Sequence, residues 1–315
     1  MKKIVLATRR RWNWKVFLVL VGLIIPATFA ILPYTISQQN ASLGWETLLL
    51  DRLINGLLIV LLGGIGLVLA NRIGLGMPYV EGWARREPVP YRFRNTIAIA
   101  WITAVVLVLL SLFLHTVVFD PPLNAMLQKL GISTPGGAQT PPLYGFLAAI
   151  SAGITEETIF RLFGLSLLAW LVGLAVRDSD GRPKPVVFWA ANILFALGFG
   201  AAHLPTEAAL GLPLNPLVVT STLVLNGIGG LAFGWLFWTF GLEGAMLAHI
   251  MADIIRHALI PFITMQEGET ARYLTTAGVV AAILVGFIWA FRSLVLEIRR
   301  QDPQIVNRKE LDISS

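Results

Sequence analysis

Long apolar runs recur along this chain and limit it to a membrane-embedded helical fold. A helix needs about 20 residues to cross the roughly 30 Å of hydrocarbon in a bilayer. Of the 315 residues, 56% are hydrophobic and 13% are charged, whereas soluble domains carry about 25% charged residues. We therefore expect an all-α fold, a polytopic membrane helical bundle of about eight transmembrane helices around a central polar cavity. The expected spans are residues 14–34, 46–70, 96–119, 143–176, 186–204, 216–240, 243–263 and 273–293.

The first run and two polar segments need separate interpretation. Basic residues precede the first run and Ala30 offers a weak cleavage site, but the run is long for a signal peptide, which favours a retained helix. Residues 120–142 are rich in Pro and Gly and predict an irregular outer loop. The polar tail from Gln301 is expected to be frayed.

The distribution of Lys and Arg predicts the orientation in the membrane. Basic residues gather before the first span, in the second and fourth connections and after the last span, whereas 35–45 and 205–215 have none. Both termini then face the cytoplasm. Short connections without eukaryotic targeting signals favour a multi-pass protein of a prokaryotic cell membrane. The net charge of +6 is spread over these connections, which predicts no nucleic-acid partner.

One cluster of charges lies inside the apolar segment 143–176. It contains Glu156, Glu157 and Arg161, and an ionised group at bilayer depth costs at least about 2.5 kcal/mol. Glu157 and Arg161 are four apart and can neutralise each other on one helix face. Glu156 points elsewhere without a partner in its helix, as suits a general base. The alternative is a structural salt bridge with one polar residue lining a water-filled crevice.

Two more clusters follow in later apolar segments. Phe199 and His203 share a face at the end of 186–204, and His203 alone is typical of an interfacial residue. His249 and Asp253 are also four apart, and such a pair fixes an imidazole tautomer, binds a metal or joins two helices. His257 extends that face by a turn, and His115 is expected to be interfacial. The chain lacks cysteine and an H-E-x-x-H motif, which excludes disulfides, thiolate zinc sites and a zincin-type site.

Together the clusters resemble a family pattern, namely E-E-x-x-x-R, then F-x-x-x-H, then H-x-x-x-(N or D) on separate membrane helices. This is the pattern of the CAAX prenyl endopeptidase and bacteriocin-processing family of intramembrane proteases, also called CPBP or Abi. The segments 241–249 and 74–81 are similar to family segments as well. The resemblance divides the single membrane domain into N-terminal helices and loops at 1–142, a catalytic core at 143–263, and a last helix with a cytoplasmic tail at 264–315. It is carried by Glu156, Glu157, Arg161, Phe199, His203, His249 and Asp253.

The resemblance implies hydrolysis of a peptide bond in a membrane-associated or lipidated protein or peptide. By position, Glu156 is the general base, His203 orients the water, and His249 and Asp253 stabilise the oxyanion. Glu157, Arg161 and Phe199 then have supporting roles. Some accounts of the family instead make such groups metal ligands. The cofactor is therefore either none or a divalent metal such as zinc, held by Glu156, His203 and His249.

Asp253 leaves the mechanism open, because an ionised carboxylate only accepts hydrogen bonds. It must be protonated, orient His249 as a donor, or bind a metal. Two other functions are also open. A catalytically inactive family member can act as a membrane scaffold, a regulator or an immunity protein. A transporter is disfavoured by the lack of an internal repeat and of charges along a pore.

Overall fold

The computed structural model describes residues 12–38, 44–89, 92–131 and 140–301, and almost all of them are helical. Within these ranges there is no strand, only an isolated bridge between Arg177 and Pro183. The helices that precede the charged segment are α1 Trp14–Ala30, α2 Leu32–Gln38, α3 Trp45–Ile73, α4 Pro78–Arg85, α5 Phe93–Phe113, the π-helix η1 Leu114–Phe119 and α6 Asp120–Leu130. The others are α7 Pro142–Glu157, the π-helix η2 Thr158–Leu165, α8 Ser166–Gly173, α9 Pro185–Ala201, α10 Leu204–Ala209, α11 Pro216–Phe240, α12 Leu242–Ile254, the π-helix η3 Ile255–Leu259, α13 Ile260–Thr264 and α14 Glu269–Gln301.

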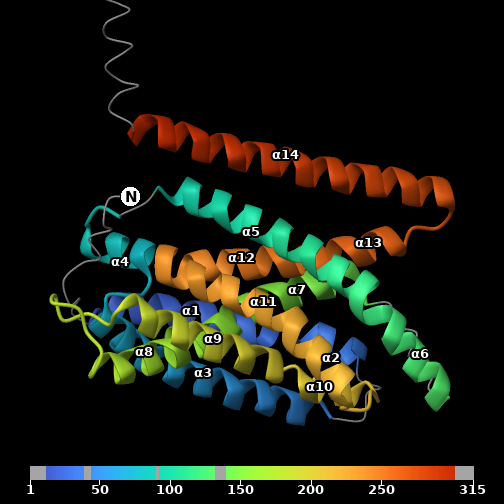
Figure 1. The fold of residues 1–315 in the computed structure, drawn as a ribbon, viewed down its shortest axis with the longest axis horizontal. Helices are drawn as coiled ribbons and strands as arrows, with labels where there is room; N and C mark the ends of the chain where they lie inside the picture. Colours follow the sequence, from blue (N-terminus) through green and yellow to red (C-terminus); the bar gives the residue numbers. More distant parts are fainter. Residues whose placement is uncertain (1–11, 39–43, 90–91, 132–139, 302–315) are drawn as a thin grey trace, which may run out of the picture.

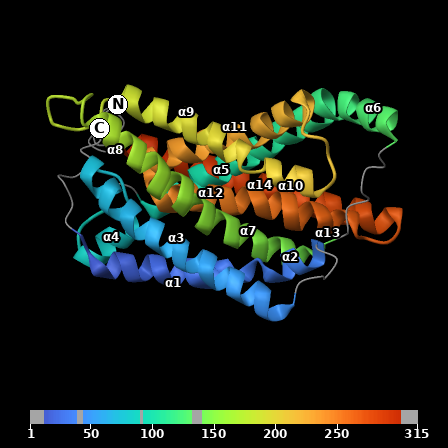
Figure 2. The same ribbon diagram turned by 90° about the horizontal axis from the view of Figure 1, so that it is seen from below.

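The polytopic helical bundle is confirmed. Within the described residues, seven helices are long and apolar enough to cross a membrane. The eighth expected span, 143–176, is not among them, although it is helical throughout as α7, η2 and α8. Its central charges, Glu156, Glu157 and Arg161, distinguish it from the other seven. It nevertheless runs the length of the bundle beside them, from the end that holds α6 to the end that holds α4 (Figures 1 and 2).

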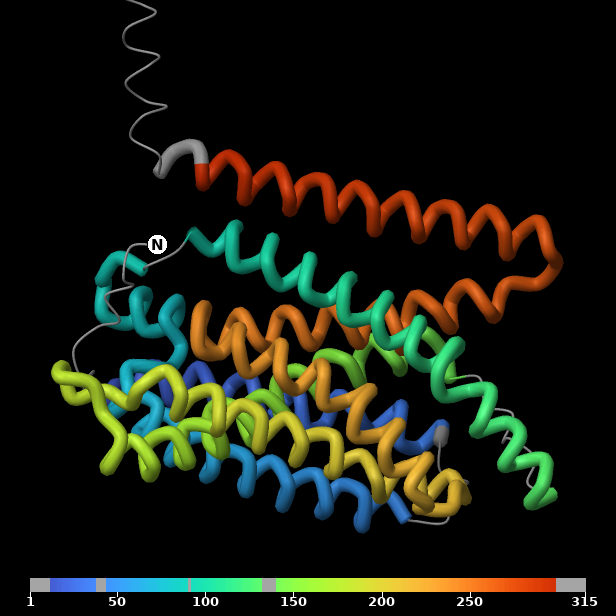
Figure 3. Tube along the Cα trace, in the orientation of Figure 1, coloured from blue at the N-terminus to red at the C-terminus, as the bar shows by residue number. Residues whose placement is uncertain are grey.

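Part of one segment expected to be irregular is helical. Residues 120–130 form α6, which continues from α5 through η1 along one continuous path (Figure 3). Its two prolines, Pro121 and Pro122, are the second and third residues of α6 and directly follow the π-helix η1. The helix stops at Gly131, whose φ of 65° suits glycine. Residues 132–139 of the expected loop, and the tail after Gln301, lie outside the described residues.

Helix α12 lies at the centre of the bundle and carries one of the polar clusters. It packs against α5, α7 and α11, while α9 packs on α11 and α14 lies outside α5 (Figure 1). Close packing with α7 depends on Gly153, where a Cβ atom would lie only 3.0 Å from the backbone nitrogen of Ile250. The acidic pair at the end of α7 is thereby brought beside the histidine of α12.

The C-terminal ends of α7 and α12, which carry the acidic residues, each continue into a π-helix. Glu157 is the last residue of α7 before η2, and Asp253 lies two residues before η3. A π-helical turn inserts an extra residue into a helix and rotates the side chains that follow, and it occurs frequently at functional sites. Here η2 places Arg161 and η3 places His257 relative to those acids.

Candidate active site

Glu157, Arg161 and His249 form the buried centre of the polar network. The two charged side chains of η2 and α7 are at most 1% exposed, and His249 is 4% exposed. The Oε1 atom of Glu157 accepts a hydrogen bond of 2.9 Å from Nη1 of Arg161, and it lies 2.8 Å from Nδ1 of His249. A lone buried carboxylate is strongly unfavourable. Two donors on one oxygen therefore compensate for its loss of water.

Aromatic rings enclose this centre. The guanidinium carbon of Arg161 lies 4.5 Å from the ring centroid of Phe199 and 5.5 Å from that of Phe233. The Phe233 ring stacks on the imidazole of His249 at 4.6 Å, with an interplanar angle of 14°. Nη2 of Arg161 also donates to the carbonyl of Gly230 at 3.1 Å. The ring faces attract the cation, and together these contacts fix both nitrogen-bearing side chains.

Glu156 and Asp253 lie on the other side of the His249 ring. Their carboxylate oxygens are 3.9 Å and 3.4 Å from Nε2. Their side chains are 33% and 23% exposed, against 5% for His249 and none for Glu157. The two adjacent glutamates therefore differ: Glu157 is buried with donors on one of its oxygens, whereas Glu156 is partly exposed in the cavity.

His203 approaches the same place from α9 and α10. It lies between Ala201, the last residue of α9, and Leu204, the first of α10. Its Nδ1 is 2.8 Å from the carbonyl oxygen of Phe199. A carbonyl oxygen only accepts, so Nδ1 carries the proton of that hydrogen bond, which leaves Nε2 for another partner. The helix was expected to reach Leu204, and it ends three residues earlier, at Ala201.

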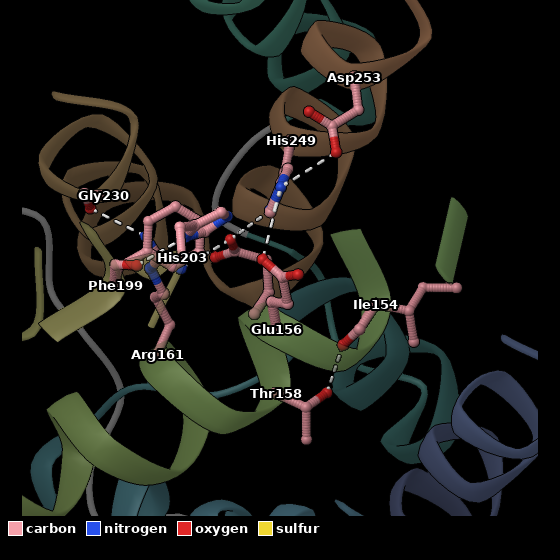
Figure 4. A network of polar contacts seen from close by, with 10 residues as sticks. Ile154, Glu156, Thr158, Arg161, Phe199, His203, Gly230, His249 and Asp253 are labelled. Carbon is pink, nitrogen blue, oxygen red and sulfur yellow. Dashed lines mark hydrogen bonds and ion pairs between the residues drawn. The ribbon is translucent and has the colours of Figure 1, made fainter. Parts of the chain in front are cut away.

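A cavity of about 490 Å³ joins these side chains. Glu156, His203, His249 and Asp253 all line it, and Figure 4 shows their polar groups gathered around one space. The expectation of a central polar cavity is thus met. The cavity continues toward the end of the bundle that holds α6 and α10, where Asp120 and Glu207 line it. The site therefore connects with one end of the bundle.

Residues 138–255 match the family model described as type II CAAX prenyl endopeptidase Rce1-like. The chain carries an Rce1-like region. All seven residues on which the sequence resemblance rested lie within it. No curated protein and no solved structure matches the chain in the corresponding comparisons.

The Rce1-like region contains the cavity residues Glu156, His203, His249 and Asp253, whereas α2, α5, η1 and α6 add further lining from outside it. It begins just before α7, includes η2, α8, α9, α10 and α11, and ends just after α12. The family that this region matches is one of CAAX prenyl endopeptidases. The seven long apolar helices indicate a multi-pass membrane protein. The roles of individual side chains go beyond this match.

The three metal ligands predicted for the Rce1-like region, Glu156, His203 and His249, do not form a coordination group. Within the described residues, no three His, Asp or Glu side chains are grouped so that they can hold a metal ion. Nδ1 of each histidine faces an oxygen of the protein, as it also does in metal-binding histidines whose other ring nitrogen holds the ion. Nε2 of His249 faces two carboxylates. These contacts are compatible with a metal-free site and with Nε2 as a metal ligand. Metal dependence stays a prediction, and no step below runs through a metal.

Sequence reasoning missed one contact and one residue of the site. The Glu157–Arg161 pair was predicted from its spacing and is confirmed. The contact of Glu157 with His249 joins residues 92 apart, and no local spacing could reveal it. Phe233 was also missed. The sequence feature that could have drawn attention to it is its position among the glycines of α11. His115, expected to be a lone interfacial residue, instead pairs with Asp120 at 2.8 Å.

Proposed function

We propose that this protein is an intramembrane endopeptidase that hydrolyses a peptide bond of a membrane-associated or lipidated protein or peptide. The observation that carries the proposal is the convergence of a partly exposed carboxylate and two imidazoles on one cavity inside the bundle. These groups can take a proton from water and donate hydrogen bonds to a polarised carbonyl. The family match supports the same reaction class.

Glu156 is the proposed general base. Its neighbour Glu157 is unsuited, because one of its oxygens is held by Arg161 and His249 and its side chain is wholly buried. The separation of 3.9 Å between Glu156 and Nε2 of His249 exceeds a direct hydrogen bond. The Glu156 carboxylate is therefore free to accept a proton from a water molecule in the cavity.

His203 is proposed to orient that water. With Nδ1 donating to the carbonyl of Phe199, its Nε2 presents a lone pair that can accept the second O–H of the water. The Phe199 ring lies edge-on to the imidazole, with centroids 5.0 Å apart, and holds it in place. Substrate water is thus held between a carboxylate and an imidazole.

His249 is proposed to stabilise the oxyanion. When both its nitrogens are protonated, one N–H donates to Glu157 and the other points between Asp253 and Glu156. In the resting site Asp253 faces Nε2–H and orients the ring, which is one of the roles open to a carboxylate at this position. During the reaction the same N–H donates to the oxyanion instead. A preorganised donor of this kind commonly contributes about 10²–10³ in rate.

The proposed reaction balances within these residues. Glu156 removes a proton from water, the water oxygen bonds to the carbonyl carbon, and the carbonyl oxygen takes the negative charge beside His249. The carbon–nitrogen bond then breaks, and the leaving nitrogen takes the proton from Glu156. The apolar wall of the cavity, which includes Leu107, Leu225 and Ile228, suits a substrate that enters from the membrane.

The test is cleavage of a peptide library by purified protein in lipid, with wild type beside Glu156→Gln. We expect the variant to fold and to lose activity by about 10²–10⁴-fold, the usual contribution of a general base. His203→Ala and His249→Ala should lose activity too, whereas His115→Ala and His257→Ala serve as controls and should keep it. A parallel series with a chelator tests the metal alternative.

Each outcome has a clear reading. Full activity of Glu156→Gln would contradict the assignment of the base. Loss of wild-type activity on chelation, with recovery on adding zinc, would replace this mechanism by a metal-dependent one. Absence of cleavage by wild type across the library would favour the inactive, scaffold-like function.

A further inference from the structure

A second cavity lies at the opposite end of the bundle from α6 and α10. Its volume is about 480 Å³, and it shares no residue with the catalytic cavity. It lies where α3 ends at Ile73 and α8 ends at Gly173, near α4 (Figures 1 and 2). We call it the arginine pocket, and its polar and aromatic lining is Trp12, Asn71, Arg72, Trp170 and Arg177.

The charged residues that line the arginine pocket are all positive. Arg72 and Arg177 line it, and no acidic residue does. Within the described part of the chain, neither arginine forms an ion pair with a carboxylate. The Arg72 guanidinium lies 5.2 Å from the ring centroid of Trp170. The Nε–H group of Arg177 donates a hydrogen bond to the carbonyl oxygen of Gly173 at 2.6 Å. Its two terminal nitrogens are left to bind an anion.

A buried amide completes the lining. Asn71 is 8% exposed, and its side-chain oxygen is buried without a hydrogen-bond partner among the described residues. Buried polar atoms are nearly always paired, so an unpaired one calls for an explanation. An amide can accept from a hydroxyl or, turned over, donate to a phosphate oxygen. The unpaired oxygen can therefore accept from a hydroxyl of a bound ligand, such as a lipid headgroup, and a phosphate oxygen pairs with Asn71 only through the N–H donors of its amide.

The surroundings of the arginine pocket identify the ligand as a lipid. Its apolar walls, Val68 and Leu174, are 38% and 51% exposed. They continue into the exposed side chains of Leu171 and Val172 of α8, which form part of the outer surface of the bundle. Tryptophans such as Trp12 and Trp170 are typical of the membrane–water interface. A headgroup at this depth keeps its acyl chains against that apolar surface.

We propose that the arginine pocket binds the phosphate of an anionic phospholipid, with Arg72 and Arg177 as its cationic contacts and Asn71 as its neutral one. Basic pockets at the ends of membrane helices bind such headgroups, and each basic residue near an anionic surface contributes about 1 kcal/mol. That corresponds to roughly fivefold in affinity for each arginine. The proposal is independent of the proteolytic function, because the two cavities share no side chain.

The experiment is native mass spectrometry of the whole protein released from detergent, with phosphatidylglycerol or phosphatidylcholine added. We expect wild type to retain phosphatidylglycerol preferentially and to lose this preference as ionic strength rises. The double variant Arg72→Gln/Arg177→Gln should bind phosphatidylglycerol about 25-fold more weakly. The matched control Arg94→Gln/Arg292→Gln removes the same charge outside the pocket and should bind like wild type.

Three results would overturn the assignment. Equal retention of the two lipids by wild type would remove the anion preference, and this measurement needs no variant to fold. Undiminished binding by the double variant, or an equal loss in the control variant, would place the lipid elsewhere. Complete displacement of phosphatidylglycerol by inorganic phosphate would make the ligand a soluble phosphate instead of a lipid.

Discussion

Two adjacent glutamates have different environments because one residue turns a helix by about 100°. Glu157 points between α7 and α12, where Arg161 and His249 hold one of its oxygens. Glu156 points into the cavity, where its side chain keeps a third of its exposure. At the scale of single residues, Glu156 is available for chemistry, and Glu157 holds Arg161 and His249 in place beside it.

Arg161 is the residue whose removal should affect folding most. Arg161→Met leaves Glu157 buried without its cation, and breaking a buried pair in this way costs about 3–5 kcal/mol. We expect a large drop in melting temperature in detergent, measured by circular dichroism. Arg161→Lys should be intermediate, because it keeps the charge but cannot reach both Glu157 and the carbonyl of Gly230.

A matched control for this prediction is Arg52→Met. Arg52 also pairs with an acid, its neighbour Asp51, but that acid's side chain is 47% exposed. Exposed pairs contribute only about 0–1 kcal/mol. A melting temperature for Arg161→Met as high as that of Arg52→Met would show that the buried pair does not hold the fold.

Asp253 separates the mechanisms that the sequence left open. If it only orients His249 across 3.4 Å, Asp253→Asn retains an oxygen that accepts and adds a donor for the oxyanion. We then expect activity within about tenfold of wild type, and a loss of about 10²-fold or more in Asp253→Leu. Initial cleavage rates at saturating substrate measure both. Equal inactivity of the Asn and Leu variants would show that the negative charge itself is required.

Spacing within one helix was the most informative feature of the sequence at this scale. The four-residue separations of Glu157 from Arg161 and of His249 from Asp253 correctly predicted contacts. Contacts between helices, such as Glu157 with His249 or His249 with Phe233, depend on how α7, α11 and α12 pack. A single sequence does not determine that packing.

At the scale of elements, the approach of α7 to α12 sets the geometry of the site. Gly153 lies one turn before Glu156 and Glu157, and it faces the backbone of α12 beside His249. An added Cβ atom would lie 3.0 Å from the nitrogen of Ile250 and 3.2 Å from the carbonyl oxygen of Met246. Backbone atoms cannot move aside singly, so any larger residue must push the two helices apart.

Gly153→Ala should therefore reduce both stability and activity. Overpacking of this kind costs about 1–3 kcal/mol, and the shift should lower the cleavage rate because the acids move away from His249. The control is Gly198→Ala on α9, where nothing lies within 4 Å of the added atom and where alanine favours the helix. Melting temperature and cleavage rate are measured for both. Unchanged activity in Gly153→Ala would show that the close approach is not needed.

The elements were predicted with different success for physical reasons. Helix α11 matches its predicted range of 216–240, because a long apolar run between Pro216 and Gly241 has clear ends. Helix α6 was missed because Pro121 and Pro122 were interpreted as loop residues, whereas they follow the π-helix η1 within a continuous helical path. The π-helical turns were not predictable from the local sequence. These turns nevertheless set the directions of the side chains that follow Glu157 and Asp253.

At the scale of the whole molecule, the two ends of the bundle differ in chemistry. One end holds the arginine pocket between α3 and α8, and the catalytic cavity continues toward the other, where α6 and α10 lie. Helix α1 begins and α14 ends at the same end as the pocket (Figures 1 and 2). An experiment that shows which side of the membrane one end of the bundle faces therefore also shows which side the other end faces.

The Lys and Arg distribution predicts that the arginine-pocket end is cytoplasmic, and the lack of cysteine in the chain makes this testable. Ser179→Cys lies in the exposed loop after α8, and Ala209→Cys lies at the exposed end of α10. In intact spheroplasts, a membrane-impermeant maleimide should label Ala209→Cys at once and Ser179→Cys only after permeabilisation. The cysteine-free wild type is the control for background. The reverse pattern would invert the topology and place the opening of the catalytic cavity on the cytoplasmic side.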